Sequence, residues 1–407
     1  MTTFLGPFAA LRPRPDQAAA VIAPPYDVVN TDEARTLVRN RPSSFLHISR
    51  PEIDLPPGSS PYSDAAYARG AQNLAALIES GALVRDPEPS FYVYRMTSGG
   101  RVQTGIACVA SIAAYVANRV RKHELTRPDK ENDRVRNIET LNAQTGPVQC
   151  AYRANTTLAS LLGESAAAAP TFEAVGPNDV LHSVWRVHDT TSVARIGAAL
   201  DALDAIYIAD GHHRAAAAAR VARNRNGKGN ADHLLVVAFA HDEMRILDYN
   251  RVVRDLRGLS TEELLKRISE SFAVERSVAA VAPDTPQTFG MYLAGSWYRL
   301  QVRRELVPAN DPVASLDVSL LQDRLLAPIL GVGDPRTDPR IDFVGGIRGL
   351  GELERRVQSG AAAVAFSLHA TRMEQLMAVA DADRLMPPKS TWFEPKLADG
   401  LLSHVID

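Results

Sequence analysis

A short polar turn between two apolar stretches constrains this chain more than any other feature. Residues 206–219 read IYIADGHHRAAAAA, with five polar or glycine positions between an apolar run and an alanine run. The apolar run is typical of the end of a buried strand, and the stretch 215–223 is typical of a helix. The polar residues are therefore expected on the turn between strand and helix. Backbone N–H groups are free at such a turn, and the helix dipole favours an anion there.

The residue types on this turn suit an anionic ligand. Gly211 permits a tight turn or the close approach of a ligand, and Arg214 can donate two hydrogen bonds to a phosphate or carboxylate. Asp210 can bind a metal ion or accept a proton. Adjacent histidines usually point in different directions, so His212 and His213 are not expected to bind one metal ion together. A capped turn held by an Arg–Asp pair is the structural alternative. We favour a ligand site, because five consecutive polar or glycine positions exceed what a cap needs.

Three other stretches concentrate polar groups that fold stability does not require. Residues 122–134, KHELTRPDKENDR, place histidine, glutamate and threonine directly after an apolar strand, where sites are often built. Residues 387–396, PPKSTWFEPK, combine two lysines, two hydroxyl groups and an aromatic pair, which suits the wall of a phosphate or substrate pocket. Residues 24–27, PPYD, place a tyrosine and an aspartate after an extended entry. Their plainer interpretations are a solvated loop, a docked tail and packing, respectively.

The order of elements predicts the fold class. Strand-like and helix-like segments are mixed without strict alternation, which favours an α+β fold with some α/β character. We place domain boundaries near residues 95 and 255. The three regions are then an N-terminal α/β region (1–95), a core with the HELT and DGHHR motifs (96–255), and a C-terminal α+β region with the PPKSTWFEPK motif (256–407).

Composition and missing motifs exclude several classes of protein. The formal net charge of −2 over 407 residues gives no global attraction toward nucleic acid or an anionic membrane. Cys108 and Cys150 are too few for a disulfide framework and are expected to be reduced. We find no signal-peptide pattern and no uncharged apolar run of about 18 residues, so a cytoplasmic protein without a membrane span is expected. The sequence also has no P-loop, no dinucleotide-binding glycine motif, no nucleophile elbow and no HExxH zinc helix.

Together, the four polar stretches resemble a bacterial and archaeal family filed as domain of unknown function ten-fifteen. The match extends over nearly the whole chain, in the family's order. The matching residues are APPYDVV (23–29), KHELTRPDKENDR (122–134), IADGHHRAAAA (208–218) and MPPKSTWFEPKLADGL (386–401).

A narrower resemblance concerns the turn itself. ADGHHRAAA is similar to the phosphate-binding motif of the ParB/sulfiredoxin superfamily, whose G-x-x-R-x-x-A core corresponds to Gly211, Arg214 and Ala217. The free-serine kinases of that superfamily carry an Asp-Gly-x-His-Arg version, which Asp210 and His213 complete here. The resemblance implies a ParB/sulfiredoxin-like phosphate-binding core with additional α/β elaborations. It also implies nucleotide phosphates held at this turn with magnesium, and phosphoryl transfer to the hydroxyl of serine or a similar small metabolite.

The sequence departs from the family pattern directly after this motif. Ala215 and Ala216 follow Arg214, where the family has an aromatic residue and then an acid. Any contact made by those two side chains is therefore absent from this chain.

Our leading hypothesis is a kinase-like phosphotransferase. Such enzymes act mainly by positioning and by neutralising charge. The expected donor is a nucleotide such as ATP or ADP, or pyrophosphate, with Mg²⁺ held by Asp210. Glu124, with His123 alongside, is the expected general base, and Asp210 is a second candidate for that role. The expected phosphate or nucleotide contacts are Gly211, His212, His213, Arg214, Lys122, Lys389, Ser390, Thr391 and Lys396. The expected substrate pocket is formed by Tyr26, Asp27, Thr126 and Arg134.

Two alternatives from other functional classes stay open. A nucleotide-binding regulator of the ParB type finds its best support in the basic residues of 219–229, but the near-neutral net charge disfavours nucleic acid as a partner. A metal-dependent hydrolase or phosphatase would be built on His123, Glu124, His212, His213 and Asp210, with a spacing that matches no standard zinc pattern. The expected partners are therefore a small-molecule substrate and a phosphate donor, and a homodimer is compatible with the sequence.

Overall fold

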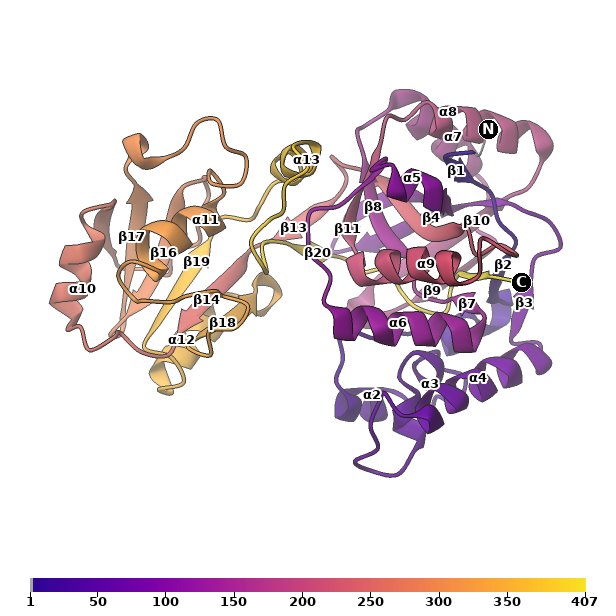
Figure 1. Cartoon of the computed structure of the whole chain (residues 1–407), viewed down its shortest axis with the longest axis horizontal. Coiled ribbons are helices and arrows are strands. Elements are labelled where there is room, and N and C mark those ends of the chain that lie inside the picture. The colour runs from indigo at the N-terminus through magenta and orange to yellow at the C-terminus, as the bar shows by residue number, and fades with distance from the viewer. Residues whose placement is uncertain (1–2) are drawn as a thin grey trace. The chain divides into compact units, whose positions relative to one another are not determined.

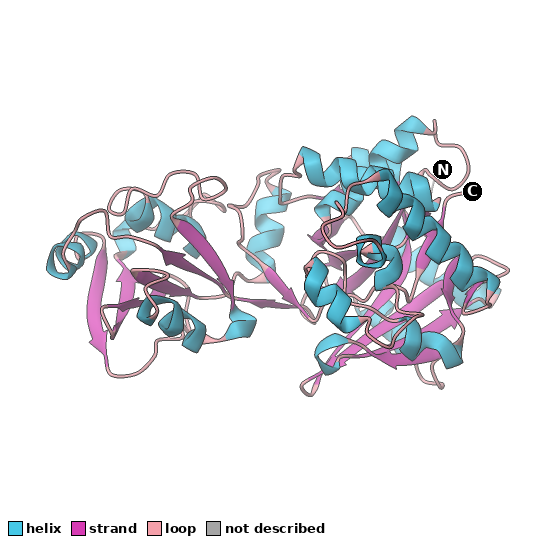
Figure 2. Cartoon of the chain, turned by 90° about the horizontal axis from the view of Figure 1, so that it is seen from below, coloured by secondary structure: helices cyan, strands magenta, loops and turns pink. Residues whose placement is uncertain are grey.

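The computed structural model describes residues 3–407, which form two compact units (Figure 1). Unit 1 contains residues 3–244 and 395–407, and unit 2 contains residues 245–394. The chain leaves unit 1 once and returns to it near the C-terminus. Helices and strands are mixed in both units, which confirms the predicted α+β class (Figure 2). Among the described residues, no helix has the length and apolar character needed to span a membrane.

This division differs from the domain boundaries that the sequence suggested near residues 95 and 255. Residue 95 lies inside β4 (Phe91–Ser98), which pairs on both sides within the main sheet of unit 1. Residue 255 lies inside unit 2, and the C-terminal strand β21 (Ser403–Val405) pairs with β2 (Ala10–Pro13) in unit 1. Composition does not mark these boundaries, because they arise from strand pairing between distant parts of the chain.

The main sheet of unit 1 brings the sequence motifs to neighbouring strands. Its strand order is β6-β11-β8-β12-β5-β4-β10-β9, with β1 alongside β5. Its central strands include near-continuous apolar runs such as HLLVVAFA, because hydrophobic clusters cover both faces of the sheet. A smaller sheet has the order β3-β2-β21-β7. The remaining strands of unit 1 are β1 (Leu5–Gly6), β3 (Leu83–Arg85), β5 (Arg101–Ser111), β6 (Val120–Arg121), β7 (Ala143–Gln144), β8 (Val148–Tyr152), β9 (Phe172–Val175), β10 (Leu181–Val187), β11 (Ile206–Asp210) and β12 (His233–Ala240).

The alanine run after the polar turn forms a helix that packs closely on this sheet. Helix α9 (His212–Asn224) lies against β8 and β12 and beside α6 (Pro128–Leu141) (Figure 1). Ala215, Ala217 and Ala218 are buried, and their small side chains allow the close approach. The other helices of unit 1 are α1 (Ala18–Val21), α2 (Thr31–Leu37), α3 (Leu46–Ser49), α4 (Asp64–Glu79), α5 (Ile112–Val116), α7 (Thr156–Ser165) and α8 (Thr190–Asp201).

Unit 2 is built on a separate antiparallel sheet with the order β15-β17-β16-β19-β14-β18. The first and last strands of unit 2, β13 and β20, pair with each other in an antiparallel ribbon. The strands of unit 2 are β13 (Arg245–Leu247), β14 (Tyr249–Val253), β15 (Phe272–Ser277), β16 (Thr288–Leu293), β17 (Ser296–Val302), β18 (Ile341–Gly345), β19 (Val364–Leu368) and β20 (Trp392–Glu394). Its helices are α10 (Thr261–Ile268), α11 (Asp317–Leu321), α12 (Leu350–Gln358) and α13 (Met373–Asp381).

Candidate active site

The predicted strand–turn–helix is present at the DGHHR motif. Strand β11 ends at Asp210, and α9 begins at His212. Gly211 between them is left-handed, with φ 101° and ψ 28°, a conformation that glycine adopts without steric strain. No side chain among the described residues caps the first turn of α9. The amides at the start of the helix are therefore suited to an anionic ligand.

Arg214 is bound into the protein at the same turn. Its Nη1 donates to the carbonyl oxygen of Pro147, and its Nη2 donates to Asp210 Oδ2 at 2.8 Å. Asp27 Oδ2 lies 3.9 Å from the same Nη2. Burial opposes the charge of the guanidinium, but the neighbouring carboxylates outweigh burial and raise the pKa of Arg214 above its usual range. The Arg–Asp pair that we considered as the structural alternative is therefore present.

One donor of Arg214 is left for a ligand. Its Nε is buried and has no hydrogen-bond partner among the described residues. A Cβ atom on residue 211 would lie 3.0 Å from that Nε and 3.3 Å from Nη2. The absence of a side chain at Gly211 therefore lets this edge of the guanidinium pack next to the uncapped helix start. Buried donors are normally paired, so the orphaned Nε–H marks a place for an acceptor atom.

Asp210 is held between two cations. Arg214 engages one carboxylate oxygen, and Lys396 Nζ lies 3.5 Å from the other. Burial opposes ionisation of this carboxyl, but the charges of Lys396 and Arg214 lower the pKa of Asp210 below its usual range. Both oxygens of the carboxylate that we predicted to bind Mg²⁺ therefore already interact with a cation.

Sequence reasoning missed two buried groups near the DGHHR turn. Asp399 is 3% exposed, and burial raises the pKa of its carboxyl to about 7. A Cβ atom on Gly146 would lie 3.4 Å from Asp399 Oδ1 and 3.3 Å from Arg214 Cδ, so this glycine makes room for both side chains. Gln149 pairs with Asp210 across β8 and β11, and its Oε1 is buried without a partner among the described residues. A signal for Asp399 was available, because it precedes a left-handed glycine, as Asp210 does.

The two histidines of the motif hold the loop that carries the HELT motif. His212 Nε2 accepts from the backbone N–H of His123 at 3.4 Å, and His213 Nε2 accepts from the backbone N–H of Arg127 at 3.0 Å. The sequence predicted phosphate contacts for both histidines. In the structure Nε2 of each ring binds one of these two backbone amides, and the main-chain N–H groups of both histidines lie in the first turn of α9.

The loop contacts predict a local dependence on pH. Burial lowers the pKa of both His212 and His213, so their rings are neutral acceptors at pH 7. A depressed folded-state pKa gives stability that is present above the usual histidine value of about 6.5 and is lost as the pH falls further. We expect the amides of His123 and Arg127 to lose protection from hydrogen exchange between pH 7 and 5, after correction for intrinsic exchange. The amide of Leu235, which donates to the non-titrating Gln144 side chain, serves as the control. Equal behaviour of all three amides would contradict this prediction.

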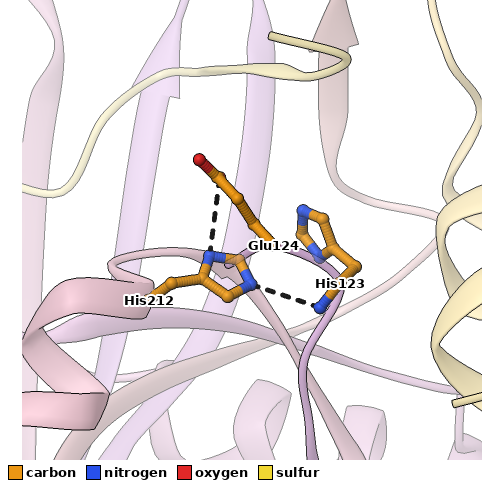
Figure 3. A group of neighbouring side chains, drawn as sticks. All are labelled: His123, Glu124 and His212. Carbon is orange, nitrogen blue, oxygen red and sulfur yellow. Dashed lines mark hydrogen bonds and ion pairs between the residues drawn. The ribbon is translucent and has the colours of Figure 1, made fainter. Parts of the chain in front are cut away.

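His123, Glu124 and His212 form a compact group (Figure 3). One ligand-type atom from each lies within 4.8 Å of the others, and His212 Nδ1 is 3.9 Å from Glu124 Oε2. The two imidazole rings meet edge to face, with centroids 4.4 Å apart. His123 is 2% exposed and its Nδ1 is buried without a partner among the described residues, whereas the Glu124 side chain is about half exposed. Two predicted catalytic residues therefore lie together with one predicted phosphate ligand.

Some of the other predicted residues of unit 1 contact one another, and the rest contact residues outside the predicted set. The guanidinium of Arg134 lies 3.8 Å from the ring centroid of Tyr26, which places two of the predicted pocket residues in contact. Asp27 joins them through Arg214. Thr126 Oγ1 donates to Glu131, and the Lys122 ammonium lies 4.8 Å from the ring centroid of Tyr115.

Three predicted phosphate ligands belong to unit 2. Lys389 has φ 55°, and its ammonium lies 5.6 Å from the ring centroid of Tyr249. Ser390 Oγ donates to the carbonyl oxygen of Pro387 at 2.6 Å. Thr391 lies in the same segment. The structure therefore divides the PPKSTWFEPK motif, because its last lysine, Lys396, belongs to unit 1.

A substitution at the turn tests its geometry. Gly211→Ala should destabilise the protein by roughly 1–3 kcal/mol, because alanine is strained at φ 101° and its Cβ would meet the Arg214 guanidinium. Gly163→Ala in α7 is the matched control, since a Cβ atom there would meet no atom within 4 Å beyond its own helix, and alanine favours a helix. Urea unfolding measures both variants. A Gly211→Ala protein as stable as the control would contradict the described turn.

Comparison with known proteins gives a family and several distant structures. A family model described as "Protein of unknown function (DUF1015)" matches residues 5–319. Similar solved structures include a free serine kinase in complex with AMP, at 12% identity and a TM-score of 0.36, covering 73% of this chain and 91% of that chain. SbnI from Staphylococcus aureus, with a C-terminal truncation, has 11% identity and a TM-score of 0.38, covering 73% of this chain and 86% of that chain. A conserved hypothetical protein from Pyrococcus furiosus has 12% identity and a TM-score of 0.36, covering 73% and 94%.

No curated protein matches the chain. The family match, in contrast, spans most of the sequence and includes the HELT and DGHHR motifs. The chain therefore belongs to the DUF1015 family.

Proposed function

We propose that unit 1 is a phosphotransferase that moves a phosphoryl group from a nucleotide or pyrophosphate to the hydroxyl group of a small metabolite such as free serine. The observation that carries the proposal is the orphaned, buried Nε–H of Arg214 beside left-handed Gly211, at the uncapped start of α9. A phosphate oxygen at this position would receive the Nε–H, helix amides and the favourable end of the helix dipole together.

The surrounding charges support an anionic donor that is held by cations. Arg214 and Lys396 both lie at Asp210, so their positive charges stay fixed beside the helix start. In this proposal Asp210 holds the two cations in place. It does not act as the base, because the same cations stabilise its ionised form and make it a poor proton acceptor. Charges that are fixed before the reaction stabilise the transferring phosphoryl group without reorganisation.

Glu124 is the proposed general base. Its side chain is about half exposed, and its carboxylate lies 3.9 Å from His212 at the start of α9. In the proposed reaction the acceptor oxygen attacks phosphorus, and a new O–P bond forms. The bond from phosphorus to the leaving oxygen of the donor breaks, and the hydroxyl proton passes to Glu124. The reverse reaction would use the same groups.

The acceptor pocket is proposed beside Tyr26 and Asp27. The half-exposed carboxylate of Asp27 lies at Arg214, and the unpartnered Oε1 of Gln149 lies on the strand next to Asp210. Two hydrogen-bond acceptors near a phosphate site suit an acceptor molecule that carries an ammonium group, as serine does.

A binding panel followed by a transfer assay tests this function. ATP, ADP and pyrophosphate are tested by thermal shift on the wild type and on Arg214→Lys, which keeps the positive charge but removes the Nε–H edge. A donor at about a hundred times its Kd should stabilise the wild type by roughly 2.7 kcal/mol, and the variant less. Labelled phosphate should then appear on serine. If no phosphate compound stabilises the wild type, the proposal fails.

A metal-dependent hydrolase is the second candidate, favoured by the proximity of His123, Glu124 and His212. These are residue types that zinc accepts. The regulator alternative receives less support, because two of the four basic residues of 219–229 are engaged within the protein. Arg220 pairs with Glu131, and Arg225 donates to Asn142 and to the carbonyl oxygen of Ile406.

A further inference from the structure

We propose that His212 is a positioning residue, which holds the carboxylate of Glu124 through its Nδ1–H while the backbone amide of His123 fixes its tautomer. This role rests on the proposed function in one respect, that Glu124 is the base. It assigns a specific task to a histidine that the sequence placed at the phosphate site.

The tautomer follows from the hydrogen bond at the other ring nitrogen. The backbone N–H of His123 can only donate, so His212 Nε2 must accept and carries no proton. In a neutral ring the single proton then resides on Nδ1. That nitrogen faces Glu124 Oε2 at 3.9 Å (Figure 3). In our proposal the carboxylate moves from this separation to hydrogen-bonding distance.

The neighbours of His212 keep the ring neutral. Burial is the largest influence and lowers its pKa well below the usual value. Positive charge on His123, His213 or Arg214 acts in the same direction, while Asp210 opposes it. A neutral ring with a fixed tautomer donates one hydrogen bond in one direction, which suits the orientation of a carboxylate.

A proton and a metal ion at this group require different tautomers of His212. A metal ion bound to His212 Nδ1 would move the ring proton to Nε2, where it would face the N–H of His123. Two donors would then point at each other. The buried Nδ1 of His123 remains a metal-type ligand atom, but His212 does not complete the set in this tautomer.

The first test requires no enzymatic activity. Imidazole ¹⁵N NMR spectra of the full-length protein, labelled at histidine and assigned with His212→Gln, report which ring nitrogen carries the proton. We expect the proton on Nδ1 of His212 and no change on addition of Zn²⁺. A proton on Nε2, or Zn²⁺ binding at this ring, would overturn the inference.

The second test uses two variants that imitate different nitrogens of the ring. The amide of asparagine reaches the position of Nδ1, so His212→Asn keeps a donor toward Glu124. The amide of glutamine reaches the position of Nε2, so His212→Gln keeps only the contact with the loop. We expect His212→Asn to keep kcat within about tenfold and His212→Gln to lose about a hundredfold, with the donor KM unchanged in both. His188→Asn, at an exposed histidine outside the site, is the control.

The pH profile distinguishes positioning from a loss of structure. Without the Nδ1–H donor, the Glu124 carboxylate is less stabilised, so the acidic limb of the kcat profile should move to higher pH in His212→Gln. Equal kcat losses and unmoved profiles in both variants would overturn the inference. A wild type with the Nδ1–H tautomer but no transfer activity would overturn the proposed function and leave the contact between His212 and Glu124 standing.

Discussion

Replacing Arg214 by methionine is expected to lower the free energy of unfolding by about 1–3 kcal/mol, because the change leaves the carbonyl oxygen of Pro147 and the carboxylates of Asp210 and Asp399 without this cation. The guanidinium donates to Asp210 and to the carbonyl oxygen of Pro147, and Asp27 lies 3.9 Å away. Asp399 is a further buried carboxyl whose ionisation Arg214 favours. Methionine matches the stem of arginine as far as Nε, so the measured loss combines the missing charge and hydrogen bonds with the space left by the buried guanidinium.

The control for this variant lies on the same helix. Arg220→Met removes a guanidinium that is more exposed and pairs with Glu131 at 3.0 Å. Partly exposed ion pairs contribute about 0–1 kcal/mol, so this variant should remain close to the wild type. Denaturant unfolding at pH 7.5 measures both. Similar losses of unfolding free energy in the two variants would mean that Arg214 does not contribute more to stability than an ordinary partly exposed arginine.

Replacing Glu124 by glutamine is expected to lower kcat for phosphoryl transfer by roughly 10²–10⁴-fold, the usual contribution of a general base. The amide keeps the size of the side chain but cannot accept the hydroxyl proton. Donor binding should persist, because the proposed phosphate site at Gly211 and Arg214 is unchanged. A thermal-shift titration with the donor and a single-turnover assay separate these two effects.

A matched glutamate variant controls for the loss of charge. Glu139 lies on α6, and its carboxylate accepts from Asn224 at the surface. Glu139→Gln should leave both kcat and stability near the wild-type values. If Glu124→Gln retains full kcat, the proton is taken by another group, and the role that we assign to Glu124 is wrong.

The sequence predicted the parts of the site that depend on neighbouring residues. An apolar run, a glycine and an alanine run are sufficient to predict β11, the turn and α9, because hydrophobic periodicity and the backbone freedom of glycine act locally. Gly211 and the ion pair between Arg214 and Asp210 follow from the same short stretch.

The sequence could not predict contacts that depend on chain topology. The amides of His123 and Arg127 meet His212 and His213 only because β6 and β11 pair side by side in the sheet. Asp399 reaches Arg214 because the chain returns to unit 1 after residue 394. Amino-acid composition does not indicate which strands pair or where the chain returns to unit 1.

The division of the PPKSTWFEPK motif has the same origin. Its residues are adjacent in sequence, and adjacency suggested one pocket. The end of unit 2 falls inside the motif, so Lys389 and Lys396 belong to different units. A local pattern can indicate which residue types bind an anion, but it cannot indicate where the chain passes from one compact unit to the next.

The most direct test of the central claim is a titration of the isotopically labelled wild type with pyrophosphate, followed through the backbone amide signals of residues 212–214. Our account predicts saturable shifts at these three amides and at the Nε–H of Arg214, because a phosphate group binds at the start of α9. If these signals stay fixed while pyrophosphate binds elsewhere, or does not bind, the phosphate site at the DGHHR turn is contradicted.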